Sequence, residues 1–169
     1  MKILTVLWTV CLVRLCRGKF SKAKAEGIRK ESLKAILKKL QDATKQEPLT
    51  SVPNFKSKVE STLFNVEEGK EDGVKVLKLT AKNGTKTTEL KYDEKQIWSG
   101  KARLSKSSNL VEAIIYFYKE NPALVTIQTI KGSTESIVYR YYDGSKWQNS
   151  NEKDYREFLD VLNEMSKSE

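Results

Sequence analysis

The chain has 169 residues, no histidine, two cysteines and a formal net charge of +9. This length suits one domain with a substantial core and is short for two. The absence of histidine excludes Ser-His-Asp and Cys-His catalysis and imidazole metal ligands, and the sequence holds neither a GxGxxG nor a GxxxxGK(S/T) phosphate loop. We therefore expect no enzyme, no cofactor, no metal site and no small-molecule substrate.

The first eighteen residues have the pattern of a cleaved secretory signal. Lys2 supplies a positive charge, residues 3–13 are predominantly apolar, and Cys16 and Gly18 stand at the −3 and −1 positions of a cut before Lys19. The apolar run is shorter than the roughly 20 residues that span a bilayer. We therefore expect a secreted protein without a transmembrane anchor. Cleavage would remove both cysteines and leave a disulfide-free domain.

The positive charge is concentrated in residues 19–46, which hold nine Lys or Arg and three acidic residues, whereas residues 47–169 hold nineteen of each sign. Apolar residues recur at helical spacing from about residue 25 to 45, which predicts an amphipathic helix within a basic segment at 19–47. Its apolar stripe is Ile28, Leu33, Ile36, Leu37 and Leu40. Its basic face, a candidate electrostatic patch, contains Arg29, Lys30, Lys34, Lys38 and Lys39.

Two interpretations of this helix remain open. As an electrostatic patch it would bind a nucleic acid or an anionic membrane through residues 19–46. Alternatively, the apolar stripe packs on the rest of the protein and the lysines are only solvated. We favour packing, because no aromatic side chain lies between Ala25 and Lys45 to stack on a base or to anchor in a bilayer.

Residues 48–169 are predicted to form one α+β domain. Two prolines end the helix, so we expect a linker over residues 47–54. Strand patterns predict a mostly antiparallel sheet of about six strands, drawn from residues 59–66, 73–81, 88–92, 96–100, 110–118, 124–130 and 136–142. A closing amphipathic helix is expected from about Glu152, with Asn151 as its N-cap. Its apolar stripe is Tyr155, Phe158, Leu159, Leu162 and Met165.

Local features predict how these strands connect. The apolar residues of the strand 73–81 change face at Val76–Leu77, which predicts a β-bulge. Asn83-Gly84 is a preferred two-residue turn and predicts a hairpin between that strand and 88–92. The chain is expected to turn again at Asn121-Pro122.

Four pieces occur in order within residues 59–165. They are the strand Gly73–Leu79, a hairpin to Tyr92, the segment Gln96-Ile97-Trp98, and a tyrosine-rich strand with an Asp-Gly turn at Tyr139–Trp147. Together they resemble the FAINT domain, a module that recurs in secreted proteins of Theileria parasites. The resemblance implies a parasite protein released toward the host cell, extracellular or exported into it. Our leading interpretation of its function is a non-enzymatic interaction module that binds a host protein. It assigns no catalytic residue and no cofactor.

The tyrosine-rich segment supplies the candidate protein-binding residues, which are Tyr139, Tyr141, Tyr142 and Trp147. Aromatic side chains give a large contact area at a low entropic cost and are enriched in binding hot spots. The alternative is that these rings fill the core. Because adjacent strand residues point to opposite faces, at least one of Tyr141 and Tyr142 is available for exposure.

Two short motifs complete the sequence. Asn83-Gly84-Thr85 is an N-glycosylation sequon, but turn chemistry accounts for the Asn-Gly pair, so we do not expect a glycan at Asn83. Residues 128–132, Gln-Thr-Ile-Lys-Gly, are similar to the Q-x-V-x-G inhibitory loop of cystatins, with Ile for Val. A protease-inhibitor role is therefore a further alternative, although too many strands separate this motif from the helix for cystatin topology.

Overall fold

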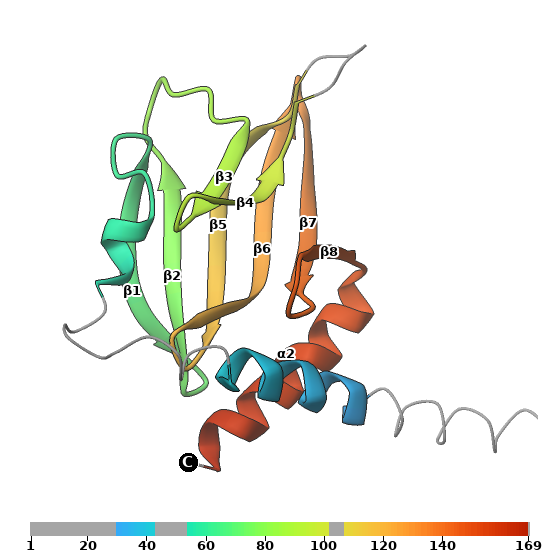
Figure 1. Cartoon of the computed structure of the whole chain (residues 1–169). Helices are drawn as coiled ribbons and strands as arrows, with labels where there is room; N and C mark the ends of the chain where they lie inside the picture. The colour runs from blue at the N-terminus through green and yellow to red at the C-terminus, as the bar shows by residue number, and fades with distance from the viewer. Residues whose placement is uncertain (1–29, 43–53, 102–106, 169) are drawn as a thin grey trace, which may run out of the picture.

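The computed structural model of the protein describes residues 30–42, 54–101 and 107–168. Residues 30–42 form the basic helix, and the elements that follow are labelled in Figure 1. They are η1 (Phe55–Lys58, a 3₁₀ helix), β1 (Phe64–Glu71), β2 (Val74–Ala81), β3 (Glu89–Tyr92), β4 (Lys95–Ser99), β5 (Asn109–Tyr118), β6 (Asn121–Lys131), β7 (Thr134–Tyr142), β8 (Trp147–Ser150) and α2 (Glu152–Lys167). The predicted α+β class is confirmed. Gly18, Lys19 and Arg29 lie outside the described residues, as does most of the predicted linker.

The strands form a large sheet and a small one. Six antiparallel strands make the large sheet in the order β1-β2-β5-β6-β7-β8, and β3 pairs with β4 alone. Figure 1 shows the β3–β4 pair in front of the middle strands, with the basic helix and α2 together at the lower end of the large sheet. β5 lies between β2 and β6, the central position that its two apolar faces predict.

Two hydrophobic clusters pack on opposite faces of the large sheet. One joins the β3–β4 side to inward residues of the sheet such as Leu77 and Leu79, and the other joins both helices to residues such as Val74 and Val76. The predicted β-bulge in β2 is therefore wrong. β2 pairs in continuous register with both neighbours, and its apolar residues change face because a different layer covers each half of the strand.

The predicted hairpin between β2 and β3 is also wrong. β3 pairs with β4 instead, and β2 already has β1 and β5 as its two partners. Asn83-Gly84 still turns the chain: the Thr85 amide donates to the Lys82 carbonyl at 3.0 Å, and Gly84 has a φ of +83°. The local turn preference was real, but it redirects the chain to a second sheet.

The element boundaries differ from the prediction at β1 and at the β5–β6 turn for identifiable reasons. Val59 caps η1 and is buried, so its apolar character belongs to a turn, and β1 runs to Glu71. β1 is an edge strand, where exposed charged residues are tolerated and protect the edge. This is why the strand predicted from the apolar pattern ends at residue 66. The β5–β6 turn lies at Lys119-Glu120, and Pro122 is already in β6.

The basic helix belongs to the folded core over its described length. Leu33, Leu37 and Leu40 are buried in the cluster that contains Phe158 of α2. The Asn121 side-chain amide also donates to the Leu40 carbonyl at 2.8 Å. The apolar stripe therefore packs on the domain, as we favoured, and the lysines occupy the outer face.

The closing helix α2 begins as predicted. The Asn151 side-chain oxygen accepts a hydrogen bond from the Asp154 amide at 2.9 Å, which satisfies one of the free donors at the helix start. Its buried residues are Tyr155, Phe158, Val161 and Leu162. Within the described ranges, neither this helix nor the basic helix is long and apolar enough to cross a membrane.

Candidate functional site

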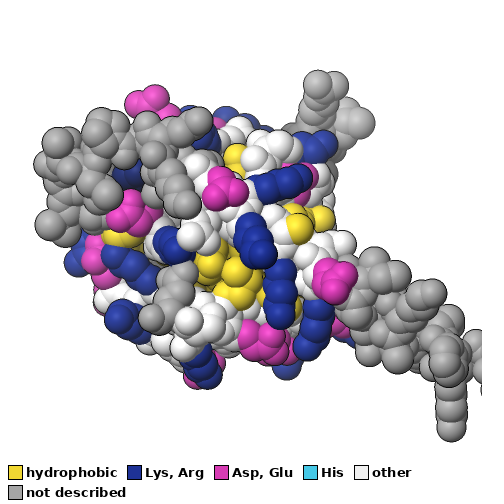
Figure 2. Space-filling model, turned by 60° about the horizontal axis from the view of Figure 1, so that its bottom comes forward, with side chains coloured by type: hydrophobic (Ala, Val, Ile, Leu, Met, Phe, Trp, Pro, Cys, Tyr) yellow, Lys and Arg dark blue, Asp and Glu magenta, His cyan; other side chains and the backbone are white. Residues whose placement is uncertain are grey.

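The β3–β4, β5–β6 and β7–β8 turns lie beside the basic helix at one end of the large sheet. Together they enclose a pocket of about 170 Å³, which we call the end pocket. Figure 2 faces this end and shows hydrophobic side chains gathered there, with Lys and Arg side chains alongside. The lining residues are Lys39, Leu40, Lys58, Tyr92, Asp93, Lys95, Glu120, Asn121, Pro122, Tyr142, Gly144 and Trp147. The pocket thus combines apolar walls with a rim of mixed charge.

The aromatic wall comes from the β7–β8 hairpin. Tyr142 and Trp147 are opposite each other in the pairing of these strands, and their ring centroids are 5.6 Å apart. Both side chains are half-buried. Tyr139 and Tyr141 lie instead against α2, where their rings contact Tyr155 at 4.9 Å and Phe158 at 5.7 Å. The structure therefore brings two of the four predicted binding residues to the pocket and uses the other two in the helix–sheet core.

Asp143 fixes the turn that carries this wall. One carboxylate oxygen accepts from the backbone amides of Ser145 and Lys146, both at 2.9 Å, and the other accepts from the Gln148 side chain at 2.6 Å. Hydrogen bonds from Gln148 and from the turn amides hold the pKa of Asp143 well below its usual range. Gly144, with φ +96°, lies close to the basic helix: an added Cβ there would be 3.8 Å from Cβ of Lys39. The turn is thus locked by one ionised carboxylate.

Removing the Asp143 carboxylate should lower the melting temperature in a pH-dependent way. We expect Asp143→Ala to melt below the wild type at pH 7, with Asp143→Asn between them because an amide oxygen can still accept from the turn. The folded pKa is depressed, so the stabilisation is complete above the unfolded value of about 3.9. It declines as the pH falls from there toward the folded pKa. Thermal melts between pH 7 and pH 2.5 should show the difference shrinking only below about pH 4; a difference constant across that range would contradict the assignment.

The rim of the end pocket carries three lysines and two acids. Lys58 is paired with Asp93, with 3.4 Å between the ammonium nitrogen and a carboxylate oxygen. Lys39 and Lys95 are exposed and form no ion pair with any residue in the described ranges, and Glu120 forms none either. The unpaired charge at the rim is therefore positive.

Tyr92 lies beneath this rim with an unused hydroxyl. The residue is 4% exposed, and its ring packs edge-on against Phe117 with centroids 5.4 Å apart. Within the part of the chain that the structure describes, its buried hydroxyl makes no hydrogen bond. Burial raises the pKa of Tyr92, so the hydroxyl keeps its proton at neutral pH. A buried hydrogen-bond donor without a partner costs about 1–3 kcal/mol, which the burial of the Tyr92 ring in the core must offset.

The predicted electrostatic patch is divided by the fold. Lys30 and Lys34 lie 3.9 Å and 4.0 Å from the Glu164 carboxylate of α2. Lys38 is exposed, and Lys39 is at the end pocket. Lys39 of the patch therefore lies at the end pocket, whereas Lys30 and Lys34 are paired with α2.

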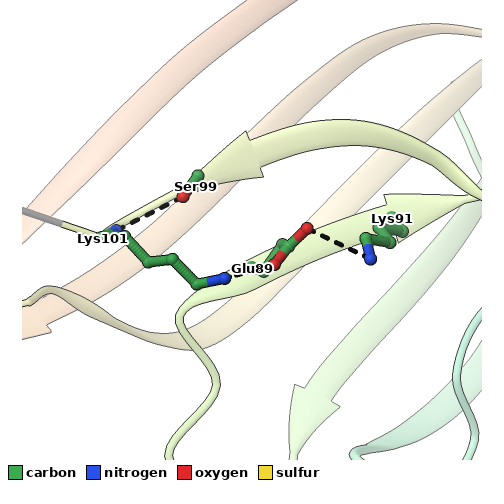
Figure 3. A network of polar contacts seen from close by, with 4 residues as sticks. All are labelled: Glu89, Lys91, Ser99 and Lys101. Atoms are coloured by element: carbon green, nitrogen blue, oxygen red, sulfur yellow. Dashed lines mark hydrogen bonds and ion pairs between the residues drawn. The ribbon is translucent and has the colours of Figure 1, made fainter.

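A separate network of ion pairs and hydrogen bonds connects the strands of the small sheet. Figure 3 shows Glu89 between Lys91 and Lys101, with 3.2 Å and 3.0 Å between the charged atoms, and the Lys101 amide bonded to the Ser99 hydroxyl. Hydrogen bonds from Lys101 and Lys91 lower the pKa of Glu89. Because Glu89 already balances these two lysines, we assign this network to holding β3 against the chain after β4.

The two short motifs take ordinary places in the fold. Asn83 is exposed in the turn after β2. Gln128, Thr129 and Ile130 lie inside β6 and pair with β7, and only Gly132 of the cystatin-like motif is in the following turn. This placement gives the motif no protruding loop of the kind that the resemblance requires.

Sequence reasoning missed Tyr92, Lys58 and Lys95. They come from the β3–β4 turn and η1, and no local pattern indicates that these meet the β7–β8 turn. Among the described residues no group of acidic, Cys or His side chains could hold a metal ion. No family model, curated protein or solved structure matches this chain.

Proposed function

We propose that this protein is a non-enzymatic binding protein whose end pocket receives one side chain of a partner protein. The observation that carries the proposal is the pairing of Tyr142 and Trp147, both half-buried, on the wall of a 170 Å³ pocket. A cavity of about 150 Å³ accommodates a benzene molecule, so this volume suits a single side chain. Aromatic residues that surround such a pocket are the typical anchors of protein interfaces.

The resemblance to the FAINT domain supports a proposal for where the protein acts. On that basis we propose a secreted parasite protein and a protein of the host cell as the partner. This role needs no catalytic residue.

The packing of the basic helix favours this role over binding to a membrane or a nucleic acid. A membrane-surface helix needs a free apolar face, whereas Leu33, Leu37 and Leu40 are buried in the protein. Lys30 and Lys34 share the Glu164 carboxylate, which reduces the charge available to a phosphate backbone. Electrostatic binding through residues 19–46 remains the alternative proposal, and its affinity would fall steeply with salt.

Capture from a host-cell lysate on immobilised protein tests the proposal. We expect at least one protein to be retained by the wild type and by Tyr141→Ala but to be reduced at least tenfold by Tyr142→Ala, because loss of a hot-spot ring typically costs about 2 kcal/mol or more. Quantitative mass spectrometry gives the readout. Tyr141→Ala is the matched control: it removes an equal side chain that packs on Phe158 away from the pocket.

Thermal melts of both variants show whether each remains folded. Equal capture of every protein by the two tyrosine variants, with both folded, would contradict a binding site at the end pocket.

A further inference from the structure

We infer that the protein forms a weak symmetric dimer in which residues 134–138 of β7 pair antiparallel with the same residues of a second copy. The inference goes beyond the proposed function and does not depend on the end pocket. It rests on three features of β7: an edge that β8 leaves open, an exposed isoleucine on that edge, and a sequence that matches itself in one register.

The large sheet is open along the first part of β7. This strand spans Thr134–Tyr142, whereas β8 pairs with Tyr139–Tyr142 only. Figure 1 shows β7 continuing well past the end of β8. Among the described residues, no strand pairs with residues 134–138 on that side. Free N–H and C=O groups at a sheet edge are a template for another strand.

The backbone groups of Glu135 and Ile137 point toward this open side. The Ser136 carbonyl faces β6, where the Thr129 hydroxyl donates to it at 3.2 Å. Successive residues of a strand direct their backbone groups to alternate sides, so those of Glu135 and Ile137 face away from β6. These two residues are therefore the hydrogen-bonding positions of the open edge.

The open edge lacks the charges that protect edge strands. β1, at the other edge of the large sheet, has Glu67, Glu68, Lys70 and Glu71 in succession around one glycine. Residues 134–138 contain one acidic residue and neither lysine nor proline, which are the residues that block edge pairing. Ile137 in this stretch is 56% exposed. Covering its side chain with a further strand would remove apolar surface from water.

The length of the open stretch favours a second copy as the occupant. It is bounded by the β6–β7 turn at one end and by Ser150, the last residue of β8, at the other. A two-fold axis at Ser136 sets Thr134 opposite Val138 of the second copy. Each open stretch then matches the other in length, and neither strand overlaps β8. Closed two-fold pairing is also the commonest symmetry of protein dimers.

The side chains match in this register. Glu135 lies opposite Ile137 of the second copy, so the two exchange backbone hydrogen bonds and the glutamate methylenes cover the isoleucine. The arrangement avoids like charges directly opposite each other, which destabilise a strand pair. An open groove of about 550 Å³ beside Ser150, lined also by Gln96 and Trp98 of β4, leaves room for the β6–β7 turn of the second copy.

The dimer is expected to be weak and to leave the end pocket free. One short strand pair buries less than the roughly 1,200 Å² of a stable interface, which is typical of transient association. Tyr142, on the wall of the end pocket, is about 20 Å along β7 from Ser136 at roughly 3.4 Å per residue. The two pockets of the dimer therefore lie at opposite ends of the joined sheet.

Opposite charges placed at Ile137 test the register by sedimentation equilibrium of the full chain, up to millimolar protein and at fixed ionic strength. Ile137→Lys faces Glu135 of the second copy and should dimerise at least tenfold more tightly than Ile137→Glu, which faces the same carboxylate. Net charge predicts the reverse, because the chain already carries +9. Both variants lose the same exposed side chain, so each is the control for the other, and circular dichroism checks that both are folded.

Engineered cysteines locate the two-fold axis in a chain whose Cys11 and Cys16 are replaced by serine. Ser136→Cys should form a disulfide-linked dimer on mild oxidation, because a non-hydrogen-bonded antiparallel pair places its Cα atoms about 4.5 Å apart, within the range of a disulfide. Thr134→Cys is the matched control on the same face of β7. Its Cα would lie about 14 Å from its equivalent, so it should cross-link at least tenfold more slowly.

The outcomes are decisive for the dimer. Tighter dimerisation of Ile137→Lys than of Ile137→Glu, together with selective cross-linking at position 136, supports it. A protein that stays monomeric at millimolar concentration overturns it, as does equal dimerisation of the two Ile137 variants or equal cross-linking at positions 134 and 136. A monomeric protein whose capture from lysate is lost in Ile137→Glu also overturns it, since the open edge would then pair with a strand of a different protein. Neither Ile137 nor Ser136 lines the end pocket, so the Tyr142 experiment tests the proposed function separately.

Discussion

Replacing Phe117 by alanine is expected to lower the free energy of unfolding by about 4 kcal/mol, because truncating a buried phenylalanine typically costs 3–5 kcal/mol. Phe117 is 2% exposed and lies in the cluster between the large sheet and the β3–β4 pair. Its ring contacts Phe55 at 4.9 Å and Tyr92 at 5.4 Å, both edge-on. Urea unfolding followed by circular dichroism measures the change.

Phe117→Leu is the control for that experiment. It keeps most of the buried apolar volume and should cost less than half as much as the alanine variant. A loss below about 1 kcal/mol for Phe117→Ala would show that this residue is not in a close-packed core.

Leu37→Ala is expected to lower the free energy of unfolding by about 3 kcal/mol, within the range for buried leucines. Leu37 is fully buried, and its cluster includes residues of α2 and of the sheet. Lys38→Ala is the neighbouring control: its side chain is exposed, so a change within about 0.5 kcal/mol is expected. The same urea titration compares the two.

The Leu37 experiment also tests the role of the basic helix. If this helix were only an appendage for binding, Leu37→Ala and Lys38→Ala would have similarly small effects on unfolding. A large difference between them means that the helix is part of the stable fold, and Lys39 and Leu40 of the same helix line the end pocket.

Patterns local in sequence predicted most of the fold. The Asn151 cap, the helical stripes of α2 and the basic helix, and the two-faced strand β5 each express a short-range preference that the structure keeps. The β-bulge predicted in β2 was wrong because the inference assumed one buried face, whereas both faces of β2 are covered. The β2–β3 hairpin was wrong because the inference assumed a simple meander, whereas β3 and β4 form a small sheet outside the main strand order.

The candidate site was predictable only in part. Tyr142 and Trp147 could be found because they flank an Asp-Gly turn, which sets them opposite each other within a few residues. Tyr92 and Lys95 join them through contacts between distant turns. Neither propensity nor spacing encodes such a contact, because it depends on which strands pair across the sheet.

The insertion of β3 and β4 between β2 and β5 has a consequence for the order in which the chain folds. β2 and β5 are neighbours in the large sheet, so their pairing must close a long excursion, which is slower than forming a local hairpin. The β7–β8 hairpin is local in sequence, but the end pocket also needs the β3–β4 turn, which lies within the segment that the β2–β5 pairing closes. A ligand of the pocket therefore recognises the completed chain and not its intermediates, and its binding draws the folding equilibrium toward the native state by mass action.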